Sequence, residues 1–254
     1  MKNEAASTHL APSQNRNIWF RALLLVSART IFSFVAQMLV TLIFAVYKHP
    51  APEMAATQWW TVYGTLVDAA CLLLIMYFLR REKARFSDLI NLDKTKIIED
   101  ILWGICLFVL VFPVTMLLGS SLASLLIYGK LQPIVPDGVI GKQLPLWGVL
   151  YSRLVWWIIW SFTEEVTYQG FALPRLTQLT GHKWIAILIV AAGWSLQHSF
   201  LPFMYNGQHF LYMFIMFFPL TIVMQLLYLR FRRLPPLIVM HWLMDFASVF
   251  FTIS

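Results

Sequence analysis

Five ionisable residues lie in three strongly apolar stretches of the sequence: Glu164 and Glu165, then His198, then His241 with Asp245. Ionisable side chains are costly inside a membrane, and those found there usually line a cavity or take part in chemistry. Carboxylates and imidazoles are also the groups that most often take a proton from water in general-base catalysis. The three stretches therefore predict one polar site, assembled between helices, that can activate water.

Glu164 and Glu165 are adjacent in a stretch predicted to be helical as far as about Leu173, and Gln169 follows Glu165 by one turn. Neighbouring residues of an α-helix point about 100° apart, so the two carboxylates cannot share one face. We therefore expect one carboxylate to face a central cavity and the other a neighbouring helix, with Glu164 as the general base. The alternative is a carboxyl pair that contacts water at a helix end.

Two histidines have a partner one helical turn away. Trp194 precedes His198 by one turn, and Asp245 follows His241 by one turn, which places each pair on one helix face. For His198 the alternative is a polar helix end anchored at the membrane interface, and for His241 it is a hydrogen bond to Asp245 within one helix. The other histidines lie in predicted loops or tails and are not expected to act: His9, His49, His182 and His209.

Composition predicts an all-α membrane protein. Of the 254 residues, 59% are hydrophobic and 12% are charged, whereas soluble domains carry about 25% charged residues. The two cysteines, Cys71 and Cys106, lie inside apolar runs and predict packing rather than a disulfide framework. The apolar runs approach the ~20 residues that a helix needs to cross a bilayer. We predict a polytopic transmembrane bundle of about seven spans, at 29–47, 59–79, 101–128, 146–173, 184–200, 210–229 and 234–251.

Three features lie outside or interrupt these spans. The first residues lack the apolar core and cleavage site of a signal peptide, so a cytoplasmic tail is predicted, followed by an interfacial segment at 18–28. Pro113 is expected to break the third span, because proline removes a helix hydrogen bond. Residues 86–92 are expected to lie along the membrane interface.

The basic residues orient the bundle. With the N-terminus inside, most of them fall on the cytoplasmic side, which predicts an N-in, C-out multi-pass protein of the plasma (inner) membrane. Attraction to anionic membrane lipid then accounts for the net charge of +7 without a nucleic-acid partner. The predicted inner residues are Lys2, Arg16, Arg21, Arg29, Arg80, Arg81, Lys83, Arg85, Lys94, Lys96, Arg175, Lys183, Arg230, Arg232 and Arg233, and the outer ones are Lys48, Lys130, Lys142 and Arg153.

The polar residues form three motifs with a characteristic order: Glu164-Glu165-x-x-x-Gln169, Trp194-x-x-x-His198 and His241-x-x-x-Asp245. These resemble the motifs of the CPBP family of intramembrane proteases, which includes type II CAAX prenyl endopeptidases and bacteriocin-processing or self-immunity proteins. The family pattern is Glu-Glu-x-x-x-Arg, Phe-x-x-x-His, and His-x-x-x-Asn or a related residue. The resemblance covers about Leu146 to the C-terminus and implies a catalytic core at 146–254. Before it, hydropathy predicts a cytoplasmic tail and interfacial segment (1–28) and N-terminal transmembrane helices (29–145).

The sequence departs from this pattern at three positions. Gln169 replaces the arginine, so Glu165 loses a cationic partner. Trp194 replaces phenylalanine and keeps an aromatic wall. Asp245 replaces asparagine, which matters if this residue donates a hydrogen bond to an oxyanion, because an ionised carboxylate only accepts. Asp245 is then protonated, or it orients His241, or the chemistry has shifted or been lost.

The resemblance implies hydrolysis of a peptide bond in a membrane-associated peptide or protein, such as a prenylated tail or a leader. Glu164 with His198 would activate water, and His241 with Asp245 would stabilise the oxyanion. Glu165, Gln169 and Trp194 would support them. No cofactor is required in this mechanism. The alternative is zinc, held by Glu164, His198, His241 and Asp245, although these residues do not form a local His-Glu-x-x-His array.

Two other classes of function remain open. A membrane scaffold or immunity protein would keep the cavity after catalysis had weakened, and the changes at Gln169 and Asp245 favour it. A proton-coupled transporter would use buried acids and histidines as a relay. Asp68, near the middle of the second span, suits a relay and equally suits a structural pair with Arg29. The sequence has no two recognisably repeated halves, which argues against the commoner transporter folds.

Overall fold

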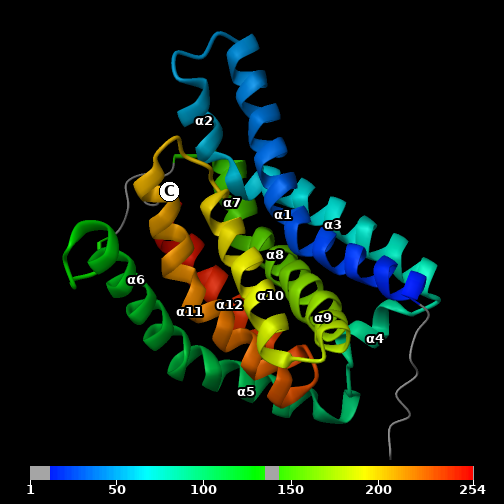
Figure 1. Cartoon of the computed structure of the whole chain (residues 1–254). Helices are drawn as coiled ribbons and strands as arrows, with labels where there is room; N and C mark the ends of the chain where they lie inside the picture. The colour runs from blue at the N-terminus through cyan, green and yellow to red at the C-terminus, as the bar shows by residue number, and fades with distance from the viewer. Residues whose placement is uncertain (1–11, 135–142, 254) are drawn as a thin grey trace, which may run out of the picture.

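The computed structural model describes residues 12–134 and 143–253, which fold into a bundle of helices without a strand (Figure 1). Two π-helical segments, η2 (Ser152–Trp156) and η3 (Glu165–Ala172), flank α8 within one long helical rod. A single 3-10 turn, η1 (Lys94–Lys96), precedes α5. The α-helices are α1 (Pro12–Val46), α2 (Pro52–Gln58), α3 (Trp60–Glu82), α4 (Phe86–Ile90), α5 (Ile97–Leu110), α6 (Phe112–Tyr128), α7 (Leu146–Tyr151), α8 (Trp157–Glu164), α9 (Leu173–Thr180), α10 (Lys183–Ser199), α11 (Gly207–Phe231) and α12 (Pro235–Thr252).

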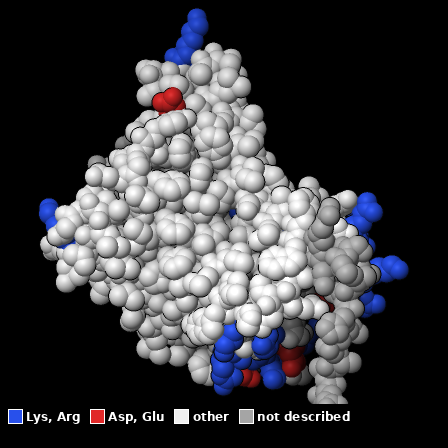
Figure 2. All heavy atoms as spheres, viewed as in Figure 1, with Lys and Arg blue, Asp and Glu red and all other residues white. Residues whose placement is uncertain are grey.

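The bundle has the dimensions of a membrane protein. Four helical stretches of the described residues are long and apolar enough to cross a membrane, and Pro235–Phe250 is a shorter apolar helix. Figure 2 shows an almost uncharged surface over the middle of the molecule, with lysine and arginine gathered at its lower and right-hand margins. The predicted all-α polytopic bundle is confirmed, whereas seven spans and the N-in, C-out orientation stay predictions. The four long stretches are Asn17–Val46, Trp60–Glu82, Phe86–Tyr128 and Gly207–Phe231.

The N-terminal helix α1 is longer than predicted. Residues 18–28 do not form a separate interfacial segment, because they continue into the first span, and Leu25 and Val26 are buried in the hydrophobic core. Arg29 therefore lies within the helix rather than at its membrane end, and it is fully buried. It cannot count among the charges that flank a span. Residues 1–11 of the predicted tail and the predicted outer residue Lys142 lie outside the described residues.

The third predicted span breaks close to Pro113, as expected. α5 ends at Leu110, and α6 begins at Phe112 with the proline in its first turn, where a missing N–H breaks no helix hydrogen bond. Upstream, α4 forms a separate short helix at the place where an interfacial segment was predicted. α6 then packs along α11. The two helices can come this close only because residue 119 is glycine: a Cβ there would lie 2.0 Å from the backbone oxygen of Met216.

The rod from α7 to α9 carries the first motif through the centre of the bundle. Every residue of η3 is buried, and η3 contacts α1, α8, α9 and α10. π-helical turns are rare and occur often at functional sites. The rod extends beyond the predicted end at Leu173 as far as Thr180. Gly181 then ends it in the left-handed conformation, with φ +66°.

Candidate active site

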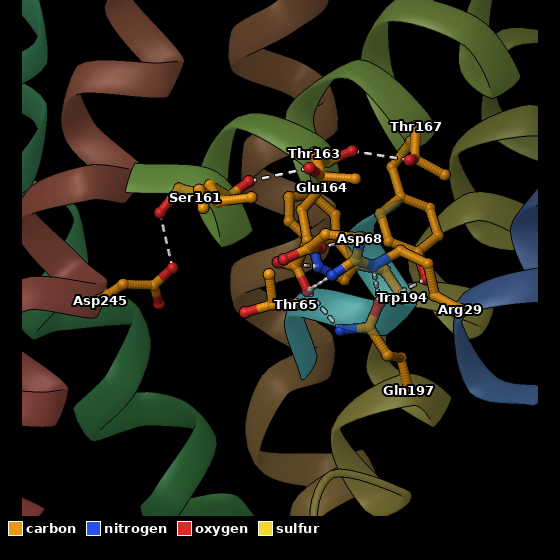
Figure 3. A network of polar contacts seen from close by, with 12 residues as sticks. Arg29, Thr65, Asp68, Ser161, Thr163, Glu164, Thr167, Trp194, Gln197 and Asp245 are labelled. Atoms are coloured by element: carbon orange, nitrogen blue, oxygen red, sulfur yellow. Dashed lines mark hydrogen bonds and ion pairs between the residues drawn. The ribbon is translucent and has the colours of Figure 1, made fainter. Parts of the chain in front are cut away.

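Glu164, the last residue of α8, is fully buried, and both of its carboxylate oxygens have partners (Figure 3). On α10, Trp194 Nε1 donates to Oε2 at 2.9 Å, and the Gln197 amide donates to Oε1. The Arg29 guanidinium of α1 lies 3.6 Å from Oε1, and His241 Nε2 of α12 lies 3.3 Å from Oε2. Side chains from three other helices therefore fix the position of this carboxylate.

Arg29 connects Glu164 to the N-terminal helices. Its Nη1 donates to Asp68 Oδ1 of α3 at 2.8 Å, and its Nε donates to Gln197 Oε1 at 2.8 Å. The guanidinium also lies over Trp160, with Cζ 4.2 Å from the ring centroid. Of the two alternatives for Asp68, the structural pair with Arg29 is present. Because an arginine side chain stays charged in proteins, Arg29 supplies a positive charge directly beside Glu164.

A single imidazole contacts both carboxylates of the first motif. His241 Nδ1 lies 2.9 Å from Glu165 Oε1, while its Nε2 faces Glu164. We expected the two carboxylates to face different surroundings because they diverge around the helix axis. Instead, the two ring nitrogens of His241 lie on opposite edges of one side chain and reach both. Only the doubly protonated ring can donate to both carboxylates at once.

Asp245 is bound to the first-motif helix rather than to His241. The Nε2–Oδ2 distance between His241 and Asp245 is 3.6 Å, which is too long for a hydrogen bond. Ser161 Oγ of α8 instead donates to Asp245 Oδ2 at 2.6 Å, and it also lies 2.8 Å from the carbonyl oxygen of Trp157. A hydroxyl has one hydrogen. When Ser161 donates to Trp157, its contact with Asp245 requires a protonated carboxyl as donor.

Among the described residues, His198 makes its ring contact with α11 and not with the two glutamates. Its ring stacks on Phe217 of α11, with the centroids 3.7 Å apart and the planes at 9°. Within the described residues, no hydrogen bond or ion pair joins His198 to Glu164; the imidazole in contact with Glu164 is that of His241. The two side chains are therefore not in direct contact, and their joint activation of a water placed between them stays a prediction.

A cavity of about 450 Å³ brings the second and third motifs together. Trp194, His198, His241 and Asp245 all line it, whereas neither glutamate does. Glu164 thus does not face the cavity as expected, because the indole of Trp194 and the imidazole of His241 lie in front of its Oε2. The rest of the wall is mainly apolar and comes largely from α6, α11 and α12, including Phe112, Met116, Met213, Met216, Met224 and Met244.

Gln169 does not support Glu165. Both atoms of its side-chain amide are buried, and neither has a hydrogen-bond partner among the described residues. An unsatisfied buried polar group costs about 1–3 kcal/mol. Gln169 therefore does not supply the positive charge that an arginine would bring to this position, and the Arg29 guanidinium lies beside Glu164 rather than Glu165.

The described residues of the site are not arranged as zinc ligands. Structural and catalytic zinc is held by three or four nitrogen, sulfur or oxygen ligands at about 2.0–2.3 Å. In the part of the chain that the structure describes, no group of three or more His, Cys, Asp or Glu side chains is arranged to hold a metal ion. Glu164 and His241 already face other side chains, so these contacts would have to open for zinc to bind.

A model of the family described as type II CAAX prenyl endopeptidase Rce1-like matches residues 146–247. The chain carries an Rce1-like domain. The predicted resemblance to the CPBP proteases is thereby confirmed, and the Rce1-like domain contains all three motifs. No curated protein and no solved structure matches the chain. Arg29 and Asp68 lie outside the Rce1-like domain, although both belong to the polar network around Glu164.

The motifs did not reveal three polar residues of the Rce1-like domain that contact the site. Gln197 precedes His198 directly, Ser161 lies one turn before Glu165, and Tyr168 donates its hydroxyl to Gln197 Oε1 at 2.8 Å. Each is a polar side chain inside an apolar stretch, which is a usable signal. Sequence spacing alone does not indicate which of these side chains face one another.

Proposed function

We propose that the chain is an intramembrane endopeptidase that hydrolyses a peptide bond of a membrane-associated substrate with a water activated by Glu164. The Rce1-like domain points to a protease. The observation that carries the proposal is the position of Glu164 Oε2, which lies between Trp194 and His241, two residues that line the cavity. In the proposed reaction one of these rings rotates, so that a cavity water reaches this oxygen.

In the proposed reaction the polar residues around the cavity have separate roles. Glu164 accepts a proton from water held between His198 and His241, and the hydroxide attacks the carbonyl carbon of the substrate. The oxyanion is stabilised by His241, whose positive charge is in turn stabilised by Glu165. The C–N bond then breaks, and the proton passes from Glu164 to the leaving nitrogen. Arg29 and Gln197 hold Glu164 in place throughout.

The apolar wall suits a substrate with a lipid or hydrophobic side chain beside the scissile bond. Its phenylalanine and methionine side chains are large and adaptable. A prenylated C-terminal peptide is therefore the substrate class that we propose first, in keeping with the name of the matching family. An apolar leader peptide would contact the same apolar wall of the cavity and serves as the second substrate in the assay.

The test is cleavage of a fluorogenic prenylated peptide by the purified protein in detergent. Glu164→Gln keeps the side-chain volume and is expected to lower kcat by at least about 100-fold, the contribution of a general base. Glu165→Gln is expected to cost less, because an amide oxygen still accepts from His241. Glu53→Gln, the same change on the exposed surface of α2, is the control.

Size-exclusion profiles and melting temperatures must show that each variant is folded. Equal activity of wild type and Glu164→Gln would contradict the assignment of the base. A folded wild type that cleaves neither the prenylated nor the leader peptide would favour the scaffold or immunity protein.

A further inference from the structure

A second pocket, of about 640 Å³, lies away from the candidate active site, where α1, α3 and α9 meet. Arg21 lines it from α1, Arg175 from α9, and Arg81, Glu82 and Lys83 from the end of α3. The apolar stretch of α1 begins near this pocket and that of α3 ends there. The pocket is therefore at the level where an apolar bundle meets lipid headgroups. Lysine and arginine gather at the matching margin of Figure 2, where α3 ends and α1 begins in Figure 1.

One carboxylate holds two of the arginines in place. Glu82 Oε1 lies 3.3 Å from Arg21 Nη1, and its Oε2 accepts from Arg175 Nε at 3.0 Å and also from Nη2. Arg175 further lies over Phe171, with Cζ 3.6 Å from the ring centroid, and donates to the carbonyl oxygen of that residue at 3.0 Å. The guanidinium groups are thus ordered before any ligand binds, which lowers the entropic cost of binding.

The other two basic residues keep their charge uncompensated. Arg81 and Lys83 are exposed, and neither forms an ion pair with another residue of the described chain. The pocket therefore has four cationic side chains against one carboxylate. Both oxygens of that carboxylate already face Arg21 and Arg175, so it leaves the charges of Arg81 and Lys83 free to attract an anion.

We propose that this pocket binds a phosphate group, and that an anionic lipid headgroup supplies it. Basic pockets between membrane helices bind such headgroups, whose phosphate offers oxygens to several donors at once. Guanidinium forks match the geometry of phosphate, and the lysine adds a mobile charge. A phosphate seated here bridges α1, α3 and α9. α9 continues directly from η3, so the ligand braces the rod that carries both glutamates.

Native mass spectrometry of the protein in detergent with equal amounts of phosphatidylglycerol and phosphatidylcholine tests the proposal. The wild type is expected to retain phosphatidylglycerol selectively. Arg81→Gln with Lys83→Gln should weaken this retention about 30-fold, since each basic residue near a headgroup contributes about fivefold. Lys83→Gln alone should lose about fivefold. It replaces the double variant if that variant does not fold.

The control is Arg80→Gln with Lys94→Gln, which removes two exposed basic residues outside the pocket. It should retain phosphatidylglycerol like the wild type. Inorganic phosphate added to protein in phosphatidylcholine alone distinguishes the sources: a rise in Tm of the wild type but not of the pocket variant indicates free phosphate as the ligand. Equal lipid retention by wild type and pocket variants, with no phosphate effect on either, overturns the proposal.

Discussion

Replacing Arg29 by glutamine tests whether the buried network stabilises the fold as well as the site. The change removes the guanidinium that lies 2.8 Å from Asp68 and 3.6 Å from Glu164, all with fully buried side chains. Removing one partner of a buried ion pair costs about 3–5 kcal/mol, because the remaining charge is buried without compensation. For a chain of this size each kcal/mol lowers Tm by roughly 2–4 °C. The expected loss is therefore roughly 6–20 °C.

The matched control lies on the same helix. Arg21→Gln removes an ion pair to Glu82 at 3.3 Å, in which the side chains are 19% and 16% exposed. Such partly exposed pairs contribute about 0–1 kcal/mol, so Tm should fall by less than about 4 °C. Asp68→Asn added to Arg29→Gln removes one of the unpaired carboxylates and should recover part of the loss. The reasoning is refuted if Arg29→Gln and Arg21→Gln melt at the same temperature.

Three further predictions concern the site, the packing and the topology. Asp245→Asn keeps an acceptor for Ser161 and adds a donor, so its activity in the presence of chelator should stay within about tenfold of wild type. A loss of activity that added zinc restores would instead indicate that Asp245 is a metal ligand. Gly119→Ala should destabilise the protein by about 1–3 kcal/mol, because its Cβ meets the Met216 backbone, whereas Gly207→Ala, with no atom within 4 Å of its Cβ, should melt like wild type. A reporter fused after Ser254 should be external, and a cytoplasmic signal would contradict the seven-span prediction.

Long apolar runs with polar flanks allowed the later helices to be predicted closely. The predicted spans 184–200, 210–229 and 234–251 correspond to α10, α11 and α12. The prediction is wrong where a charged residue lies inside a span: hydropathy places the start of the first span at Arg29, whereas Arg29 lies inside α1 and pairs with Asp68 in the interior. Hydropathy along one segment cannot reveal a partner on another helix.

The residue types of the site were predictable, but their pairing was not. Polar residues in apolar helices predict a shared site, and the structure brings His198 and His241 to one cavity, with Glu164 behind Trp194 and His241. The imidazole beside Glu164 is nevertheless that of His241, because the contact depends on the rotation of α12 and on the wider turn of η3. Neither rotation nor a π-helical turn has a clear signal in one sequence.

The salt bridge between Arg29 and Asp68 has a consequence for dividing the protein. Both residues precede position 146, whereas Glu164, which Arg29 contacts, follows it. A fragment consisting of residues 146–254 alone therefore contains a buried glutamate whose counter-charge is on the missing half. Co-expressed halves would have to recombine before either the pair or Glu164 is satisfied. Complementation between the fragments before and after position 146 would therefore report whether α1 and α3 dock onto the helix rod, independently of cleavage.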